Sequence, residues 1–96
     1  MIVEYIRYRI SAEQQSAFIE AIRAANNLLA ASPDCLRYEL THCAEDPTRF
    51  VWRIEWTSVE RHLQGFRKSP EFWAFFQLVK PFYVGIEEMQ HYAVVE

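Results

Sequence analysis

Four segments in which apolar and polar residues alternate restrict this 96-residue chain to folds built around a β-sheet. Successive side chains of a strand point to opposite faces of a sheet, so alternation predicts a strand with two chemically different faces. The alternating segments are residues 2–10, 35–43, 49–56 and 86–95. In the third of them the large apolar side chains share one face, namely Phe50, Trp52, Ile54 and Trp56.

A helical signal fills the gap between the first two strands. Residues 11–14 form a capping box, in which Ser11 caps the helix and Gln14 occupies its third position. The apolar residues that follow recur at spacings of four, three and four, as in an amphipathic helix: Phe18, Ile22, Ala25 and Leu29. The sequence Ser32-Pro33-Asp34 predicts the end of this helix.

Two further helices are expected between the third and fourth strands, after a turn at residues 45–47 joins the second strand to the third. Residues 57–60 form a second capping box, and Gly65 suits the end of the short helix that it opens. Ser69-Pro70 then opens another helix, with proline at its first position, and Pro81 ends it. The apolar positions of this last helix are Phe72, Phe75, Phe76 and Val79.

The order strand-helix-strand-strand-helix-helix-strand predicts an α+β fold on the ferredoxin-like plan. Such a fold is one antiparallel sheet with helices on one face only, and the length favours a single domain over residues 1–96. The open face of the sheet is expected to mix charged and apolar side chains, the latter including Val3, Tyr5, Val51 and Met89. A two-fold homodimer that stacks two such faces would bury them.

Charge and composition exclude several classes of function. The net charge is -3 and the pI is about 5.6, with acidic and basic residues scattered along the chain. Nucleic-acid backbones demand a basic stripe, so nucleic acid is not an expected partner. The apolar run at residues 1–10 contains charges, which excludes a signal peptide or membrane span there. We therefore expect a cytoplasmic protein without membrane contacts.

The two cysteines, Cys35 and Cys43, fall eight positions apart on one predicted strand. At ~3.3 Å per residue they would lie ~26 Å apart, which is far beyond disulfide reach. We expect free thiols, which are typical of a reducing compartment. His42 and Cys43 are metal-ligating residue types, but neighbouring strand residues point to opposite faces and cannot easily share an ion. We expect no metal site.

A single histidine, His62, lies among aromatic residues in the segment 50–76. It follows Val59 by three positions and precedes Phe66 by four, so the three share a helical face that should point at the sheet. A histidine in that place could exchange a proton near neutral pH. The same pattern also fits a hydrogen-bonded histidine in an ordinary core, and the sequence leaves both interpretations open.

The candidate walls of a small-molecule pocket around His62 are Trp56, Phe66, Phe72, Trp73 and Phe76. Planar side chains can stack on an aromatic substrate, although large aromatic residues are also the ordinary content of a core. Arg67 and Lys68 are expected either at a solvated helix junction or at a pocket mouth, where they would attract an acidic substrate. His91, on the last strand, is expected at the surface or in an interface.

The segment 54–76, IEWTSVERHLQGFRKSPEFWAFF, resembles the antibiotic biosynthesis monooxygenase family, a branch of the dimeric α/β-barrel superfamily. The family pattern is a strand ending in Trp, a helix with His, and a helix opened by Ser-x-x-Phe. Here these are Trp56, His62 and residues 69–72. The resemblance covers the whole chain, because element order and length also agree. It implies a homodimer of ferredoxin-like subunits, each with a pocket between sheet and helices.

Some members of this family oxygenate polycyclic aromatics or quinols with molecular oxygen and without metal or flavin, and others degrade haem. The haem-degrading branch carries an Asn on its first strand and a ligand His after Ser-x-x-Phe. This chain has no Asn in residues 1–10 and has Phe76 in place of that His, so the resemblance does not extend to haem.

The resemblance is closest to quinol-monooxygenase-like members, which commonly have a histidine at the position of His62. It implies a cofactor-independent monooxygenase that acts on a small aromatic substrate and molecular oxygen. Our own prediction is that His62 is the catalytic base of such an enzyme. The alternative is a non-enzymatic ligand-binding or accessory dimeric domain, in which the same aromatic residues form only a core.

Overall fold

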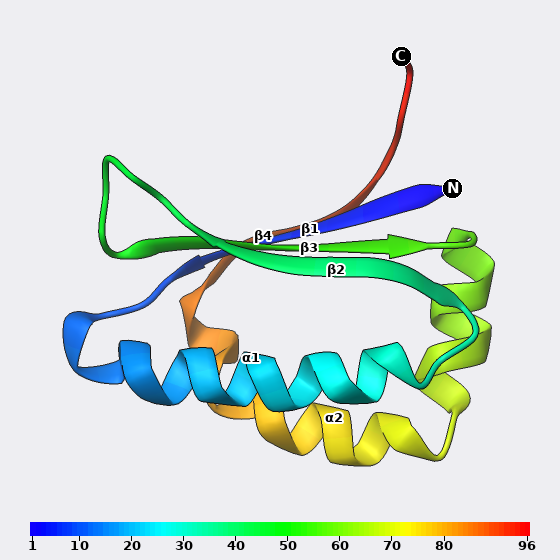
Figure 1. Ribbon diagram of the computed structural model, residues 1–96, viewed down its shortest axis with the longest axis horizontal. Helices are drawn as coiled ribbons and strands as arrows, with labels where there is room; N and C mark the ends of the chain where they lie inside the picture. Colours follow the sequence, from blue (N-terminus) through cyan, green and yellow to red (C-terminus); the bar gives the residue numbers. More distant parts are fainter.

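The computed structural model describes all 96 residues, which form a four-stranded sheet with helices on one face (Figure 1). The order across the sheet is β2-β3-β1-β4, and every neighbouring pair is antiparallel. This arrangement confirms the predicted α+β, ferredoxin-like fold. The strands are β1 (Ile2–Arg9), β2 (Cys35–His42), β3 (Arg49–Trp56) and β4 (Ile86–Ala93).

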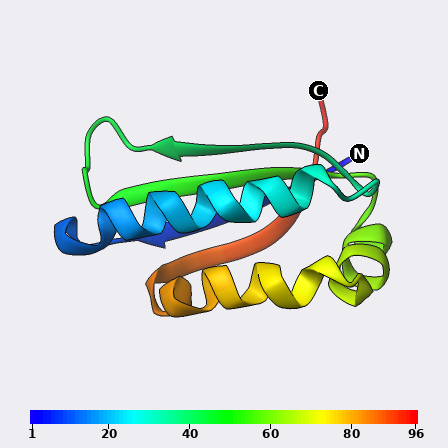
Figure 2. The same ribbon diagram turned by 60° about the horizontal axis from the view of Figure 1, so that its bottom comes forward.

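Two α-helices, α1 (Gln15–Ala30) and α2 (Glu71–Val79), lie side by side against the sheet (Figure 2). Between β3 and α2 runs a further helical segment, here called the connecting helix, with residues 61–65 in π form and 66–68 in 3₁₀ form. Two short 3₁₀ segments, Ala12–Gln14 and Lys80–Gly85, precede α1 and follow α2. None of the helices is both long enough and apolar enough to cross a membrane.

The apolar stripe of α1 forms the centre of the core, as its spacing predicts. Its four members are all buried: Phe18, Ile22, Ala25 and Leu29. Phe18 has no exposed surface, and its ring centroid lies 4.8 Å from that of Tyr8 and 5.1 Å from that of Phe50. Complete burial of such a side chain contributes about 1.5–3 kcal/mol, so this stripe attaches α1 firmly to the sheet.

The start of the connecting helix differs by one residue from the sequence prediction. Ser58, rather than Thr57, acts as the cap, because its Oγ accepts a hydrogen bond of 3.0 Å from the backbone N–H of Arg61. Arg61 also pairs with Asp34, at 2.8 Å from Nε to Oδ1. A Cβ at Gly65 would lie 2.2 Å from Asp34 Oδ2, so this position requires glycine for close approach rather than for a helix end. These contacts fix the segment that carries His62.

A β-bulge between β1 and β4 changes which residues of β4 face the helices. Tyr8 pairs with Ile86 and Arg7 with Glu88, so the register shifts by one residue between them. Met89 is therefore opposite Ile6 on the helix-covered face, and its expected place on the open face was wrong.

The open face of the sheet carries both charge and apolar surface. Two ion pairs lie on it, Arg53 with Glu55 and Arg7 with Glu88. Tyr5 meets Tyr92 edge to face, with ring centroids 5.3 Å apart. Aromatic side chains and ion pairs thus lie beside one another on this face.

Candidate active site

A cavity lies between the helix-covered face of the sheet, the connecting helix and α2. Thirteen residues line it, ten of them hydrophobic, including both Trp52 and Trp56 of β3. Its interior measures about 30 Å³, and the hollow reaches about 390 Å³ when the space that opens to solvent is counted. The interior alone holds about one water molecule.

Three of the six predicted site residues line this cavity: His62, Trp56 and Phe72. Trp56 is 1% exposed and its ring stacks on that of His62, with centroids 4.1 Å apart and planes within 8°. Phe72 contributes from the first turn of α2. Elements that are separate in the sequence therefore bring an imidazole and two aromatic walls together.

The other three predicted residues do not line the cavity. Phe66 is buried behind its wall, with its ring centroid 5.3 Å from that of Trp56. Phe76 is partly exposed and packs on Tyr83, with centroids 5.6 Å apart. Trp73 is 68% exposed on the outer side of α2. Helical spacing placed these aromatics near one another but did not distinguish the inward side of α2 from the outward side.

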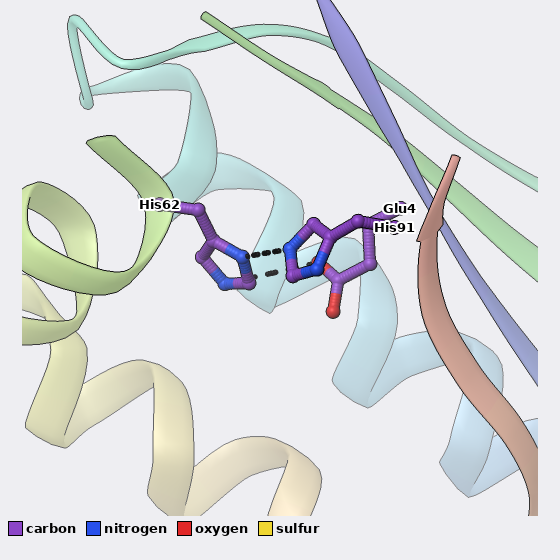
Figure 3. A group of neighbouring side chains, drawn as sticks. All are labelled: Glu4, His62 and His91. Atoms are coloured by element: carbon purple, nitrogen blue, oxygen red, sulfur yellow. Dashed lines mark hydrogen bonds and ion pairs between the residues drawn. The ribbon is translucent and has the colours of Figure 1, made fainter. Parts of the chain in front are cut away.

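Two further groups meet His62, and the sequence analysis assigned neither of them to the site. His62 Nδ1 lies 2.7 Å from His91 Nε2, a hydrogen-bond distance, and His62 Nε2 lies 3.8 Å from Glu4 Oε1. Figure 3 shows the three side chains converging from the connecting helix, β4 and β1. His91 is therefore a neighbour of the candidate base rather than the surface or interface histidine that we expected.

The pairing of β1 with β4 explains this meeting, because Glu4 and His91 are directly opposite each other. One signal for Glu4 is present in the sequence: it is the only charged residue on the apolar face of β1. Trp56 holds it in place, since the indole Nε1–H donates a hydrogen bond of 3.0 Å to Glu4 Oε1. Trp56 thus positions the carboxylate by hydrogen bonding and the imidazole by stacking.

Burial controls the protonation of this cluster. Burial, assisted by the charge of Arg67 and the proximity of His91, lowers the pKa of His62 to about 3, so its imidazole is neutral at pH 7. Burial and Arg67 also lower the pKa of His91. Burial raises the pKa of Glu4, against the opposing effects of the Trp56 hydrogen bond and of Arg67. Two neutral imidazoles therefore share one hydrogen bond.

The same three side chains were also considered as metal ligands. One ligand atom from each of Glu4, His62 and His91 lies within 4.8 Å of the others, and two imidazoles with a carboxylate suit a divalent transition metal. In this structure, however, His62 Nδ1 and His91 Nε2 lie within hydrogen-bond distance of each other, and Glu4 Oε1 accepts a hydrogen bond from Trp56. Arg67 lines the same cavity, and its charge opposes a cation. This arrangement favours a proton-handling cluster.

The structure thus combines a ferredoxin-like subunit with an aromatic-walled cavity that has a neutral imidazole at its side. A sequence model of the family "Antibiotic biosynthesis monooxygenase" matches residues 1–78. The chain therefore belongs to the antibiotic biosynthesis monooxygenase family, as its resemblance to that family implied.

Known proteins agree with this assignment at the level of the fold. The chain is 25% identical to the uncharacterized protein YczJ of Bacillus subtilis (strain 168) over 92 residues, which covers 96% of this chain and 97% of that protein. A Bordetella bronchiseptica structure assigned to the antibiotic biosynthesis monooxygenases superimposes with a TM-score of 0.81 and 22% identity, covering 99% and 97% of the two chains.

A structure of SnoaB, a cofactor-independent oxygenase from Streptomyces nogalater in mutant form, is similar in the same way. It gives a TM-score of 0.79 at 12% identity, with 99% of this chain and 93% of that chain covered. At such identity the likeness concerns the fold.

Proposed function

We propose that this protein is a cofactor-independent monooxygenase that uses molecular oxygen to oxidise an electron-rich aromatic such as a quinol. His62 is the catalytic base in this proposal, and Trp56 and Phe72 are substrate-binding walls. Membership of the monooxygenase family supports the reaction class. The description of SnoaB as a cofactor-independent oxygenase supports chemistry between substrate and oxygen alone.

The observation that carries the proposal is the free nitrogen of a buried imidazole. His62 is 4% exposed and engages His91 through Nδ1, whereas its Nε2 makes no hydrogen bond. The tautomer with hydrogen on Nδ1 donates to His91 and leaves a lone pair on Nε2 as a proton acceptor. The lowered pKa keeps that nitrogen unprotonated at pH 7 but also makes it a weak base, so proton transfer to it depends on stabilisation of the imidazolium by Glu4.

The chemistry then requires little more than deprotonation and exclusion of water. His62 Nε2 takes the hydroxyl proton of the quinol, and the resulting anion transfers an electron to oxygen. The two radicals combine into a peroxide on the ring, which loses water. One oxygen atom stays on the product, the other leaves as water, and the substrate supplies all four electrons. Glu4, 3.8 Å from Nε2, is placed to offset the charge on protonated His62.

Oxygen uptake with a panel of hydroquinones tests this function. We expect uptake that depends on enzyme concentration and persists after dialysis against a chelator, because no step uses a metal. A panel that produces no uptake above the rate without protein would contradict the proposal. Catalysis that is lost on chelation and restored by a metal would contradict its cofactor-independent form.

One observation favours the accessory-domain alternative. Ligand pockets commonly measure about 300–1,000 Å³, whereas the interior of this cavity measures about 30 Å³. A quinol ring enters only if side chains at the rim move. Tyr83 and Met89 line the cavity and are each 41% exposed, so they are the side chains with room to move. A protein that neither binds quinols nor consumes oxygen would be an accessory domain.

We also propose that two subunits associate through their open sheet faces. The mixed apolar and ion-paired surface around Tyr5 and Tyr92 supports this arrangement, because solvent alone covers it in one chain. Sedimentation equilibrium at micromolar concentration is expected to give about twice the chain mass of 11.4 kDa. A single species at 11.4 kDa would exclude the dimer. Tyr5→Glu should shift the equilibrium toward the monomer, because it places a charge on the open face of the sheet. Gln14→Glu adds a charge outside the sheet and serves as the control.

A further inference from the structure

We propose that the cavity selects aromatic acids, and that Arg67 binds the carboxylate of the substrate at the cavity mouth. The inference takes from the proposed function only the use of this cavity as the substrate site. It adds a charge to the substrate and names the residue that recognises it.

Arg67 stands out because it lacks a partner inside the protein. Six of the eight arginines form an ion pair with a carboxylate, namely Arg7, Arg9, Arg23, Arg49, Arg53 and Arg61. Arg67 forms no ion pair and no side-chain hydrogen bond, although it lines the cavity. Arg37 is likewise without an ion pair, but it lies on β2 opposite Glu55 of β3 and does not line the cavity.

The backbone on both sides of Arg67 is held in place. Phe66, the preceding residue, is 1% exposed and packs against Trp56. The hydroxyl of Ser69, two residues later, donates a hydrogen bond of 2.7 Å to the carbonyl of Phe66. The side chain itself is exposed. With its backbone held and its guanidinium exposed and unpaired, Arg67 can bind a ligand without breaking an internal ion pair or hydrogen bond.

The electrostatics of the cavity favour an anion. The charge of Arg67 lowers the pKa of His62, His91 and Glu4, so its field reaches the whole cluster. The two histidines are neutral at pH 7, so within the cluster only Glu4 can oppose the charge of Arg67, and Glu4 already accepts the hydrogen bond of Trp56. A carboxylate of the ligand would supply the ion-pair partner that Arg67 lacks within the protein.

The chemistry of the guanidinium narrows the choice of anion. Its planar fork donates two parallel hydrogen bonds to a carboxylate, and such charge-assisted pairs are among the stronger hydrogen bonds in proteins. The rest of the lining is largely apolar and aromatic, with Trp56 and Phe72 among its walls. An aromatic ring bearing a carboxylate satisfies both parts of the cavity.

A matched pair of ligands tests the inference by binding alone. Isothermal titration calorimetry without oxygen would compare 2,5-dihydroxybenzoate with 2,5-dihydroxybenzamide, which is similar in shape but uncharged. We expect the native protein to bind the acid roughly 10–100-fold more tightly, the usual range for a hydrogen-bonded charge. Arg67→Gln should abolish this preference, whereas Lys68→Gln, which changes the adjacent charge outside the cavity lining, should keep it.

The outcomes separate this inference from the proposed function. Equal binding of acid and amide by the native protein, or binding of neither, would overturn the role of Arg67, whatever the oxygen uptake. A preference for the acid without oxygen uptake would support Arg67 and contradict the monooxygenase. If Arg67→Gln does not fold, the native protein still tests the inference. Its preference for the acid over the amide must weaken as the salt concentration rises, because salt screens an ion pair between the ligand carboxylate and an exposed arginine.

Discussion

Replacing His62 by alanine is expected to lower the turnover of a quinol by roughly 10²–10⁴-fold, the usual contribution of a general base. The same change should lower the free energy of unfolding by about 1–3 kcal/mol, because His91 loses its hydrogen-bond partner. Oxygen uptake and urea denaturation on one preparation measure both effects. His42→Ala is the matched control, since His42 is exposed and bonds to the carbonyl of Pro47 away from the cavity.

Normal turnover per folded molecule of His62→Ala would remove His62 from catalysis and leave it a structural role. A loss of turnover in His42→Ala of similar size would show that the assay reports folding rather than chemistry. The substitution His62→Gln, which keeps polarity and most of the volume, separates the two roles further. It should largely restore the free energy of unfolding, but it should not restore turnover if His62 is the base.

Acid provides an independent check on the burial of His62. Its pKa of about 3 in the folded protein is below the ordinary 6.5, so the unfolded chain takes up the proton first as the pH falls. The folded state therefore loses stability below pH 6.5, by up to ~1.4 kcal/mol per pH unit. Unfolding measured from pH 6.5 to 5.5 should show a steeper loss in the native protein than in His62→Gln. The raised pKa of Glu4 has the opposite sign, but it is common to both proteins.

The second large effect is expected at Trp56. Trp56→Ala should lower the free energy of unfolding by about 3–5 kcal/mol, because the indole is 1% exposed, stacks on His62 and donates to Glu4. Trp73→Ala removes the same side chain from a site that is 68% exposed, and should change stability by no more than about 0.5 kcal/mol. Urea denaturation of the two variants side by side measures the difference.

Similar losses of unfolding free energy in the two tryptophan variants would contradict the burial of Trp56, on which the candidate site depends. The comparison also bears on function. Because Trp73 does not line the cavity, Trp73→Ala should keep the substrate affinity of the native protein. A large loss of affinity would mean that the outer side of α2 contacts the substrate, as its inclusion among the predicted walls implied.

Periodicity was sufficient to predict the secondary structure and the placement of His62, because both depend on residues close in sequence. His62 and Phe66 are both buried and both pack against Trp56 even though residues 61–65 are in π form. The side of α2 that faces inward was harder to predict. Aromatic residues occupy four of its positions, more than one face can hold, so their pattern did not separate Phe72 from Trp73.

The meeting of Glu4, His62 and His91 depends on pairing that no local pattern encodes. His91 reaches His62 because β4 pairs with β1 and because the bulge near Arg7 shifts the register of β4 by one residue. Simple alternation from Ile86 would instead place Ile86 and His91 on opposite faces, whereas the bulge puts Ile86 and Met89 on the same one. A shift of one residue thus places His91, rather than Gln90, opposite Glu4.

The pairing of β1 with β4 also sets the moment at which the site comes into existence during synthesis. Glu4 leaves the ribosome well before His91, yet the two are neighbours across two strands. A nascent chain that has reached the end of α2 holds Glu4, Trp56 and His62 but has no partner for the Nδ1 of His62. The cluster is complete only after β4 has been synthesised, so until then the emerging chain carries its candidate base without the hydrogen-bond partner of its Nδ1.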